Sequence, residues 1–154
     1  MLAPNSSMPI IKGKVYWFAT NVKVGKNVTI YPGAYLWGRN IEIGDDVQIG
    51  IGTIIYSKNS VKIGNHTRIA GQCYIIDMNH GKKKGELIRN QPDEFDHEGV
   101  RIGEDVWISS QCSVLKGANI HDHAVIGANS LVNKEIPENA IAFGTPAKVS
   151  SYRV

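Results

Sequence analysis

The sequence predicts an all-β protein built from short strands that repeat every six residues. An aliphatic side chain recurs at this spacing through most of the 154 residues. A period of six fits neither an α-helix, with about 3.6 residues per turn, nor a plain strand, with its period of about two. It fits a short strand followed by a corner, and repeats of this kind decide the fold. The fifteen aliphatic positions are Val24, Ile30, Leu36, Ile43, Ile49, Ile55, Ile63, Ile69, Ile75, Ile102, Ile108, Val114, Ile120, Ile126 and Val132.

A second inward position precedes each aliphatic residue by two, and it holds a small or β-branched residue. Residues two apart on a strand point to the same side, so both side chains of each pair enter the core. The residue between them points outward and is mostly polar, as at Lys23, Glu42 and Arg101. We expect glycines at the bends, such as Gly44 and Gly64, to supply backbone freedom where φ is positive. The second inward positions are Val22, Val28, Ala34, Ile41, Val47, Thr53, Val61, Thr67, Cys73, Val100, Val106, Cys112, Ala118, Ala124 and Ser130.

Three strands close a triangle, so about eighteen residues make one coil of a parallel β-helix. The spacing breaks between residues 36 and 43, between 55 and 63, and between 75 and 102. Each break follows the third strand of a coil, so all three emerge at one corner. The sequence therefore predicts five triangular coils, with one long loop projecting after coil three. The coils are centred on residues 24–36, 43–55, 63–75, 102–114 and 120–132.

A chain of this length is expected to form a single domain, residues 1–154. We number the faces of the triangle in chain order, so that Val24 begins the first face, Ile30 the second and Leu36 the third. The expected parts are an N-terminal cap segment (1–21), coils one to three (22–76), a protruding active-site loop (77–99), coils four and five (100–135) and a C-terminal tail (136–154).

Composition excludes several classes of protein. A net charge of +3 and a pI near 8.8 form no nucleic-acid-binding footprint. The run from Lys82 to Lys84 is typical of a solvated loop tip. No apolar run approaches the roughly 18 residues of a membrane span, and residues 1–12 lack the pattern of a signal peptide. Cys73 and Cys112 should stack on adjacent coils, where parallel side chains disfavour a disulfide, so we expect two buried thiols.

The loop at residues 77–99 is the expected place of function, because long insertions in compact folds are often functional. His80 closely follows the last strand of coil three, and a histidine is a natural general base near neutral pH. Asp77 is a candidate to orient the ring, or instead to bond its own backbone in a turn. Asn79 is an alternative polar contact. The other histidines, which we expect in bends or loops, are His66, His97, His121 and His123.

Four motifs follow the loop: VRIGEDVWI at 100–108, AVIGANSLV at 124–132, KEIPENA at 134–140 and GTPAKV at 144–149. Together with the repeat they resemble the hexapeptide-repeat acyltransferases. Within them the resemblance is to the sugar and polysaccharide O-acetyltransferases, such as the galactoside, maltose, capsule and exopolysaccharide enzymes. It implies a left-handed parallel β-helix and a cytoplasmic homotrimer of polysaccharide biosynthesis. It also implies acetyl-CoA as co-substrate, no metal, and active sites between subunits.

The resemblance also implies roles for individual residues. His80, in the segment Asp-Met-Asn-His-Gly, matches the family's catalytic histidine. Ser110 and Ala128 match contacts of the pantetheine arm, and their separation of eighteen residues stacks them at one corner, where a groove would run along the helix axis. The remaining cofactor-binding matches are Asn133, Lys134 and Lys148, whereas Ser151 departs from the arginine common in relatives.

The predicted coils place the groove and the loop on different corners. Ser110 and Ala128 fall between the second and third faces, whereas His80 leaves after the third. A threefold assembly would bring the groove of one subunit against the loop of its neighbour. Trp107 points outward beside the groove, where it is a candidate to bind a sugar ring or to pack between subunits. The outward apolar residues available for subunit contact are Tyr35, Trp37, Ile54, Tyr74, Trp107, Val125 and Leu131.

These observations favour direct acetyl transfer from acetyl-CoA to a sugar or polysaccharide hydroxyl, with His80 as base. One alternative is an N-acetyltransferase that acts on a nucleotide-linked amino sugar or an antibiotic. A second is a metal protein like the γ-type carbonic anhydrases, but their paired ligands lie five residues apart, and His121 and His123 are two apart. A third is a non-catalytic scaffold or an ice-binding helix, which needs rows of outward threonines where this chain offers only Thr29.

Overall fold

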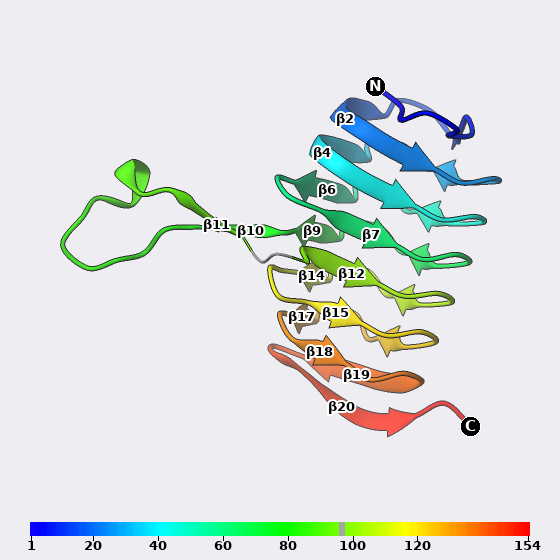
Figure 1. Ribbon diagram of the computed structural model, residues 1–154. Coiled ribbons are helices and arrows are strands. Elements are labelled where there is room, and N and C mark those ends of the chain that lie inside the picture. The colour runs from blue at the N-terminus through cyan, green and yellow to red at the C-terminus, as the bar shows by residue number, and fades with distance from the viewer. Residues whose placement is uncertain (96–97) are drawn as a thin grey trace.

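The six-residue repeat folds into short parallel strands that stack in register from coil to coil. A computed structural model describes residues 1–95 and 98–154, and Figure 1 shows a column of strands with one arm at its side. His97 lies outside the described residues. Residues eighteen apart become ladder partners, as Ile108 does with Ile126. The all-β parallel β-helix is confirmed, while its left-handed winding stays a prediction.

Two long strands, β2 (Tyr16–Val24) and β4 (Tyr35–Ile43), turn a corner and serve two faces. The first halves of β2 and β4 belong to the third face, and their second halves belong to the first face. The first face holds β7 (Val61–Ile63), β12 (Val100–Ile102), β15 (Asn119–Ile120) and β18 (Glu135–Ile136). The third face holds β6 (Ile54–Ser57), β9 (Tyr74–Ile76), β14 (Ser113–Val114) and β17 (Leu131–Val132).

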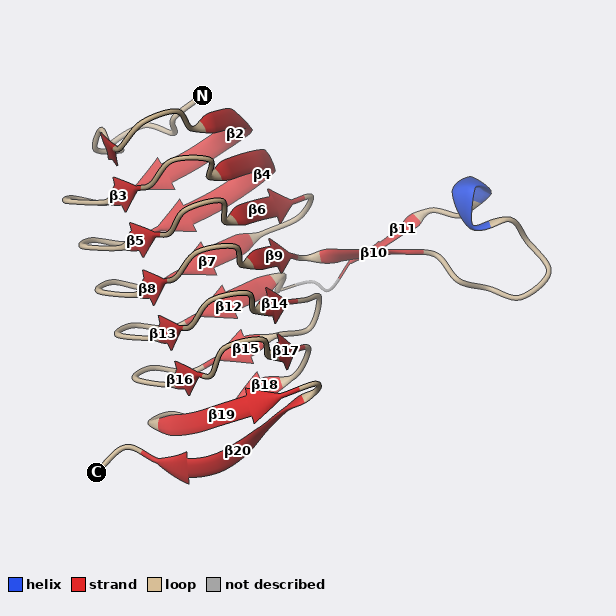
Figure 2. Cartoon of the chain, turned by 180° about the vertical axis from the view of Figure 1, so that it is seen from behind, coloured by secondary structure: helices blue, strands red, loops and turns tan. Residues whose placement is uncertain are grey.

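The second face is a separate sheet, visible from behind in Figure 2. Its parallel strands are β1 (Ile10–Ile11), β3 (Thr29–Ile30), β5 (Gln48–Ile49), β8 (Arg68–Ile69), β13 (Trp107–Ile108), β16 (Val125–Ile126) and β19 (Ala140–Gly144). β20 (Ala147–Tyr152) then folds back antiparallel on β19 and ends the column.

The core is the predicted set of inward residues. Each of the fifteen aliphatic positions is at most 3% exposed. The inward threonines are satisfied by carbonyl groups of the next coil's bend: Thr53 Oγ1 donates to Ala70 O at 2.8 Å and Thr67 Oγ1 to Gly103 O at 2.8 Å. Cys73 and Cys112 are both buried and unbridged, and they sit side by side because the adjacent strands pair in register. The interior is therefore packed and leaves function to the surface.

The prediction of five coils was too low, because the column continues at both ends into the expected cap and tail. The segment beginning at Tyr16 pairs with that beginning at Tyr35, and Ile10 pairs with Thr29. At the other end β18 and β19 add further parallel strands. Near the N-terminus an aromatic residue, Trp17, takes the inward place that Leu36 holds one coil later, so counting aliphatic residues missed this layer.

Glycine has a different role at the bends from the one expected. Gly44 and Gly64 do not have positive φ; the left-handed residue comes two positions later, as at Asp46 (57°) and His66 (58°). The bends instead require glycine for close approach between coils. A Cβ on Gly64 would lie 2.5 Å from Gly103 C. Side chains that tolerate the left-handed region, such as asparagine and aspartate, then occupy most of the turn positions that follow.

The arm leaves the column after β9. It consists of β10 (Met78–His80), a loop with one short 3-10 helix (Ile88–Asn90), and β11 (Asp93–Phe95). β10 and β11 form an antiparallel pair of their own, separate from the column sheets. Across the described residues, no helix is both long and apolar enough to cross a bilayer.

Candidate active site

The arm is a two-stranded ribbon based at the corner between the third and first faces (Figures 1 and 2). β9 ends at Ile76, and one residue later the chain enters β10. Met78 at the base of the ribbon is buried, at 5% exposed, and it is the cross-strand partner of Phe95. The ribbon therefore begins on a packed foundation before it extends into solvent.

His80 and Asp93 are cross-strand partners on the ribbon, so their side chains share one side of it. Nδ1 of His80 lies 3.0 Å from Oδ1 of Asp93. The carboxylate is an acceptor, so a neutral ring places its proton on Nδ1 and leaves Nε2 free to accept another. The His80 side chain is 70% exposed. The histidine is thus oriented and accessible, as a general base requires.

Asp77 does not orient His80, because its carboxylate is committed elsewhere. The residue is fully buried and accepts from the backbone N–H groups of the bend at residues 57–60, one coil earlier. Oδ1 accepts from Lys58 N at 2.9 Å, and Oδ2 from Asn59 N at 2.8 Å and Ser60 N at 2.6 Å. Ser57 Oγ adds a fourth bond, at 3.0 Å. Asp77 therefore anchors a neighbouring bend rather than its own turn, and Asp93 is the carboxylate beside the histidine.

Asn79 lies on the opposite side of the ribbon from His80. Successive residues of a strand alternate in direction, and Asn79 is paired with Glu94. Its side chain is exposed. Within one chain, Asn79 and His80 therefore do not point toward a common substrate.

Ser110 and Ala128 stack at the corner between the second and third faces, as their spacing predicted. The strands on either side pair in register, and Asn129 N donates to Ser110 O at 3.0 Å. Both residues are exposed. We call residues 109–111 and 127–129 the small-residue corner, since the short side chains of Ser110 and Ala128 leave its backbone open to a ligand.

Three further predicted residues occupy two different places. Asn133 and Lys134 are exposed in the bend after β17, at the same corner from which the arm leaves. Lys148 is exposed on β20, opposite Phe143. The β19–β20 turn continues the small-residue corner, because Thr145 Oγ1 donates to Asn129 O at 3.4 Å. Lys148 therefore lies near the C-terminal end of that corner, whereas Asn133 and Lys134 lie across the third face from it.

Trp107 points outward from the second face and is 53% exposed. Its ladder neighbours are Arg68 and Val125. A hollow beside it is lined by Trp107, Arg68 and Tyr31, and it reaches Gly71 at the edge of the small-residue corner. An aromatic ring and a cation beside an open corner can hold a polar ring such as a sugar.

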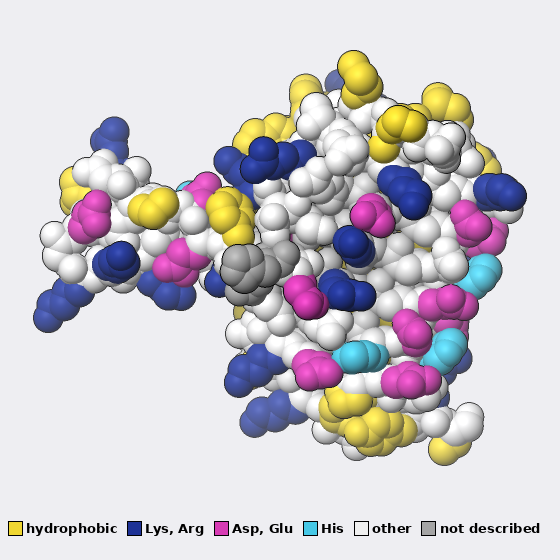
Figure 3. Space-filling view, viewed as in Figure 1, with side chains coloured by type: hydrophobic (Ala, Val, Ile, Leu, Met, Phe, Trp, Pro, Cys, Tyr) yellow, Lys and Arg dark blue, Asp and Glu magenta, His cyan; other side chains and the backbone are white. Residues whose placement is uncertain are grey.

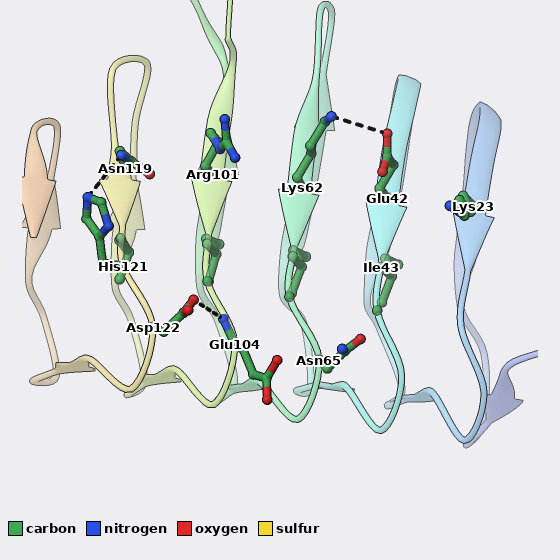
Figure 4. A pocket seen from close by; sticks show the side chains of 16 residues that line it. Lys23, Glu42, Ile43, Lys62, Asn65, Arg101, Glu104, Asn119, His121 and Asp122 are labelled. Atoms are coloured by element: carbon green, nitrogen blue, oxygen red, sulfur yellow. Dashed lines mark hydrogen bonds and ion pairs between the residues drawn. The ribbon is translucent and has the colours of Figure 1, made fainter. Parts of the chain in front are cut away.

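A larger hollow lies elsewhere, on the first face, and Figure 4 shows its lining residues. It is a broad row of charged and polar side chains, several of which have partners. Lys62 Nζ is 3.5 Å from Glu42 Oε1, and His121 Nε2 is 2.7 Å from Glu135 Oε1. Figure 3 shows the same face covered by mixed acidic and basic side chains. We interpret this face as a solvated charge ladder.

The remaining described histidines have local carboxylate partners at the bends. His66 Nδ1 is 3.6 Å from Asp46 Oδ2, and His123 Nδ1 is 3.1 Å from Asp105 Oδ2. Within residues 1–95 and 98–154, no three His, Cys, Asp or Glu side chains gather as a metal site would need.

Sequence reasoning missed Asp93 and the bend that Asp77 anchors. The His80–Asp93 pair depends on the register of the ribbon, and no repeat runs through the arm to predict it. The Asp77 bonds cross to a different coil. The one available signal would have been the alternation of side chains on a hairpin whose first strand contains His80. To use that signal, one must know where the hairpin turns.

Comparison with known proteins agrees with this architecture. Residues 99–134 match the family model described as bacterial transferase hexapeptide (six repeats). The chain is 36% identical over 138 residues to the putative lipopolysaccharide biosynthesis O-acetyl transferase WbbJ of Escherichia coli strain K12. That alignment covers 84% of this chain and 70% of the relative.

Two further proteins show how widely the fold is shared. The galactoside O-acetyltransferase of the same strain is 35% identical over 138 residues, covering 86% of this chain and 63% of the relative. A crystal structure of a point mutant of AntD, an N-acyltransferase from Bacillus cereus in complex with dTDP-4-amino-4,6-dideoxyglucose and coenzyme A, matches with a TM-score of 0.78. It is 19% identical and covers 95% of this chain and 81% of that one. From the repeat, the fold and these relatives, the chain belongs to the hexapeptide-repeat acyltransferase family.

Proposed function

We propose that the protein transfers the acetyl group of acetyl-CoA to a hydroxyl of a sugar or polysaccharide, with His80 as general base. The observation that carries this proposal is the His80–Asp93 pair, an oriented and exposed imidazole on a ribbon built out from a rigid column. The names of the E. coli relatives support acetyl transfer to oxygen. Asp93, rather than Asp77, takes the orienting role in this proposal.

The proposed reaction needs no covalent enzyme intermediate. Nε2 of His80 removes the proton from the acceptor hydroxyl as its oxygen attacks the thioester carbonyl. The resulting tetrahedral oxyanion is stabilised by backbone N–H groups at the small-residue corner or in the arm. The intermediate then expels the thiolate of coenzyme A, which recovers the proton from the imidazolium. Asp93 stabilises the positive ring between the two proton transfers.

The two halves of this site lie at opposite edges of the third face, so we propose a homotrimer with shared sites. The third face is the apolar one: Trp37 and Tyr56 pack at 4.4 Å between ring centroids, and Phe18 is 58% exposed beside Tyr35. The first face is charged and suits solvent (Figure 3). Turning the third face toward a threefold axis buries the aromatic side chains and brings the small-residue corner of one subunit to the arm of the next.

The same homotrimer would bring the predicted cofactor-binding residues of two subunits close together. Asn133 and Lys134 share the arm's corner, so they would face the small-residue corner of the neighbouring subunit. Lys148 lies at the end of that corner on the neighbour. Two cations from two subunits would then reach the phosphates of coenzyme A, while Ser110 and Ala128 let the pantetheine arm approach the backbone.

The proposal is tested by titrating acetyl-CoA into the protein by calorimetry and by screening acceptors for thioester cleavage. Binding, with turnover on hydroxyl-bearing sugars, supports O-acetylation. Turnover only on amino sugars, as the fold shared with AntD allows, would replace it with N-acylation. Absence of acetyl-CoA binding would contradict both reactions.

His80→Ala identifies the base. We expect kcat to fall by about 10²–10⁴-fold, with acetyl-CoA binding and Tm retained, because the residue is exposed. His123→Ala is the matched control, since His123 also pairs with a carboxylate but lies on another corner. Equal losses in the two variants, or retained turnover in His80→Ala, would contradict the assignment.

A further inference from the structure

We infer that Lys58 is a positioning residue for His80, acting through Asp93 from the column beneath the arm. The inference rests on the proposed function, in which His80 is the base. Lys58 belongs to the bend at residues 57–60, one coil before the arm in the stack. Side-chain contacts join this bend to the arm. Neither the six-residue repeat nor the backbone ladder of the ribbon requires these contacts.

The backbone of Lys58 is held on both sides. Its N–H donates to Oδ1 of the buried Asp77 at 2.9 Å, and its carbonyl accepts from Arg39 Nε at 2.8 Å. Buried, fully hydrogen-bonded polar groups rigidify the segments they join. The root of the Lys58 side chain therefore has a fixed origin relative to β10, which begins one residue after Asp77.

The side chain of Lys58 runs from this origin to the histidine's carboxylate. Its Nζ lies 3.8 Å from Asp93 Oδ2, while Asp93 Oδ1 is the oxygen facing His80. The ammonium also lies 5.8 Å from the ring centroid of Trp37, within cation–π range. One carboxylate is thus shared between a cation fixed to the column and the imidazole on the arm.

The contact of Asp93 with both Lys58 and His80 matters because a two-stranded ribbon is only marginally stable on its own. Asp93 is on the returning strand, β11, which among the described residues pairs with β10 and with no strand of the column sheets. Lys58 gives that strand a contact with the column at the level of the histidine. We therefore expect Lys58 to keep Asp93 Oδ1 against Nδ1 and Nε2 pointed at the acceptor.

An electrostatic role and a positioning role for Lys58 predict opposite effects on the rate when its side chain is removed. The nearby cation disfavours an imidazolium, so a purely electrostatic role would make the Lys58→Met enzyme faster. A positioning role makes it slower. The ion pair is partly exposed, and pairs of this kind are modest, so we expect kcat to fall about three- to fivefold with KM for acetyl-CoA unchanged. Lys58→Arg, which keeps a cation of similar reach, should recover most of kcat.

A double-mutant cycle tests whether the effect runs through Asp93. Lys58→Met should lower kcat in the wild-type background and leave it unchanged in the Asp93→Asn background. Lys62→Met is the matched control, because Lys62 is on the first face and pairs with Glu42. A faster Lys58→Met enzyme, equal losses in both backgrounds, or an equal loss in Lys62→Met would overturn the inference.

A second readout is independent of turnover, so it separates this inference from the proposed function. ¹⁵N NMR of histidine-labelled protein, assigned with His80→Ala, reports which ring nitrogen carries the proton. We expect a single Nδ1–H tautomer in the wild type and a mixture in Lys58→Met, at neutral to mildly alkaline pH. An unchanged tautomer in Lys58→Met would overturn the inference, even in an active enzyme. An inactive wild type with the expected NMR change would instead sink the acetyl-transfer proposal alone.

Discussion

The column and the arm are held together by different kinds of interaction. In the column, each strand repeats the contacts of the strand before it, and an inward pair such as Val106 and Ile108 meets similar pairs above and below. In the described part of the arm, no contact is repeated. Asp77 fixes its base, the His80–Asp93 pair bridges its strands, and Gln91 orders its far loop. Repetition gives the column rigidity, while single contacts give the arm its chemistry.

Truncating a buried side chain of the column should destabilise the protein far more than truncating an exposed side chain of the arm. Ile108 is fully buried, so Ile108→Ala should lower the free energy of unfolding by about 2–5 kcal/mol. Leu87 in the arm is 67% exposed, and Leu87→Ala should change the free energy by less than about 0.5 kcal/mol. Urea denaturation of both variants measures the difference. Equal losses would mean that the arm packs on a surface of its own.

The junction between the two regions should be nearly as sensitive. Asp77→Asn keeps the size of the side chain but turns an amide NH₂ toward backbone N–H donors. We expect a loss of about 2–3 kcal/mol, because buried donors are left without an acceptor. Denaturation and turnover should be measured together, since the bend that carries Lys58 loosens as well. A variant with unchanged stability would show that the bend does not depend on this carboxylate.

The same contrast explains how much the sequence predicts. Ile30, Ile75 and Ile126 could be assigned to the core because periodic burial leaves a periodic pattern. The stacking of Ser110 on Ala128 followed from the same arithmetic. The partner of His80 could not be found in this way, because Asp93 lies across a hairpin whose register is set by its loop. Asp77 misled for a related reason: closeness in sequence suggested a local role, whereas its bonds reach the preceding coil.

Within the arm, Gln91 should act locally. Its Oε1 accepts from Lys83 N at 2.7 Å, and its Nε2 donates to Glu86 O at 2.9 Å. Gln91→Ala should speed amide hydrogen exchange around Lys83 by about tenfold, the equivalent of one lost hydrogen bond, without moving the global unfolding midpoint. A shift of the midpoint would indicate that the arm and the column unfold as one unit.

A small effect is expected where Arg153 of the C-terminal segment meets the column. Hydrogen bonds from Arg153 and His123 hold the pKa of the Asp105 carboxyl below its ordinary value. A lowered folded-state pKa adds stability above the unfolded-state pKa of about 4 and loses it as pH falls through the folded value. Asp105→Asn should therefore cost less than about 1 kcal/mol at pH 7, since the pair is exposed. Thermal melts of both proteins should converge as pH falls below the folded-state pKa, and a constant difference would exclude the carboxylate as its source.

The central claim is that one active site is made from the small-residue corner of one subunit and the arm of the next. Its most direct test mixes two inactive variants, His80→Ala and Ala128→Trp, by co-refolding at equal amounts. In a threefold assembly, random mixing leaves one intact site in each mixed trimer, so about a quarter of wild-type activity should return. The parent variants, refolded separately, should stay inactive. A mixture as inactive as its parents, with mixed trimers present by mass spectrometry, would show that each site lies within a single chain.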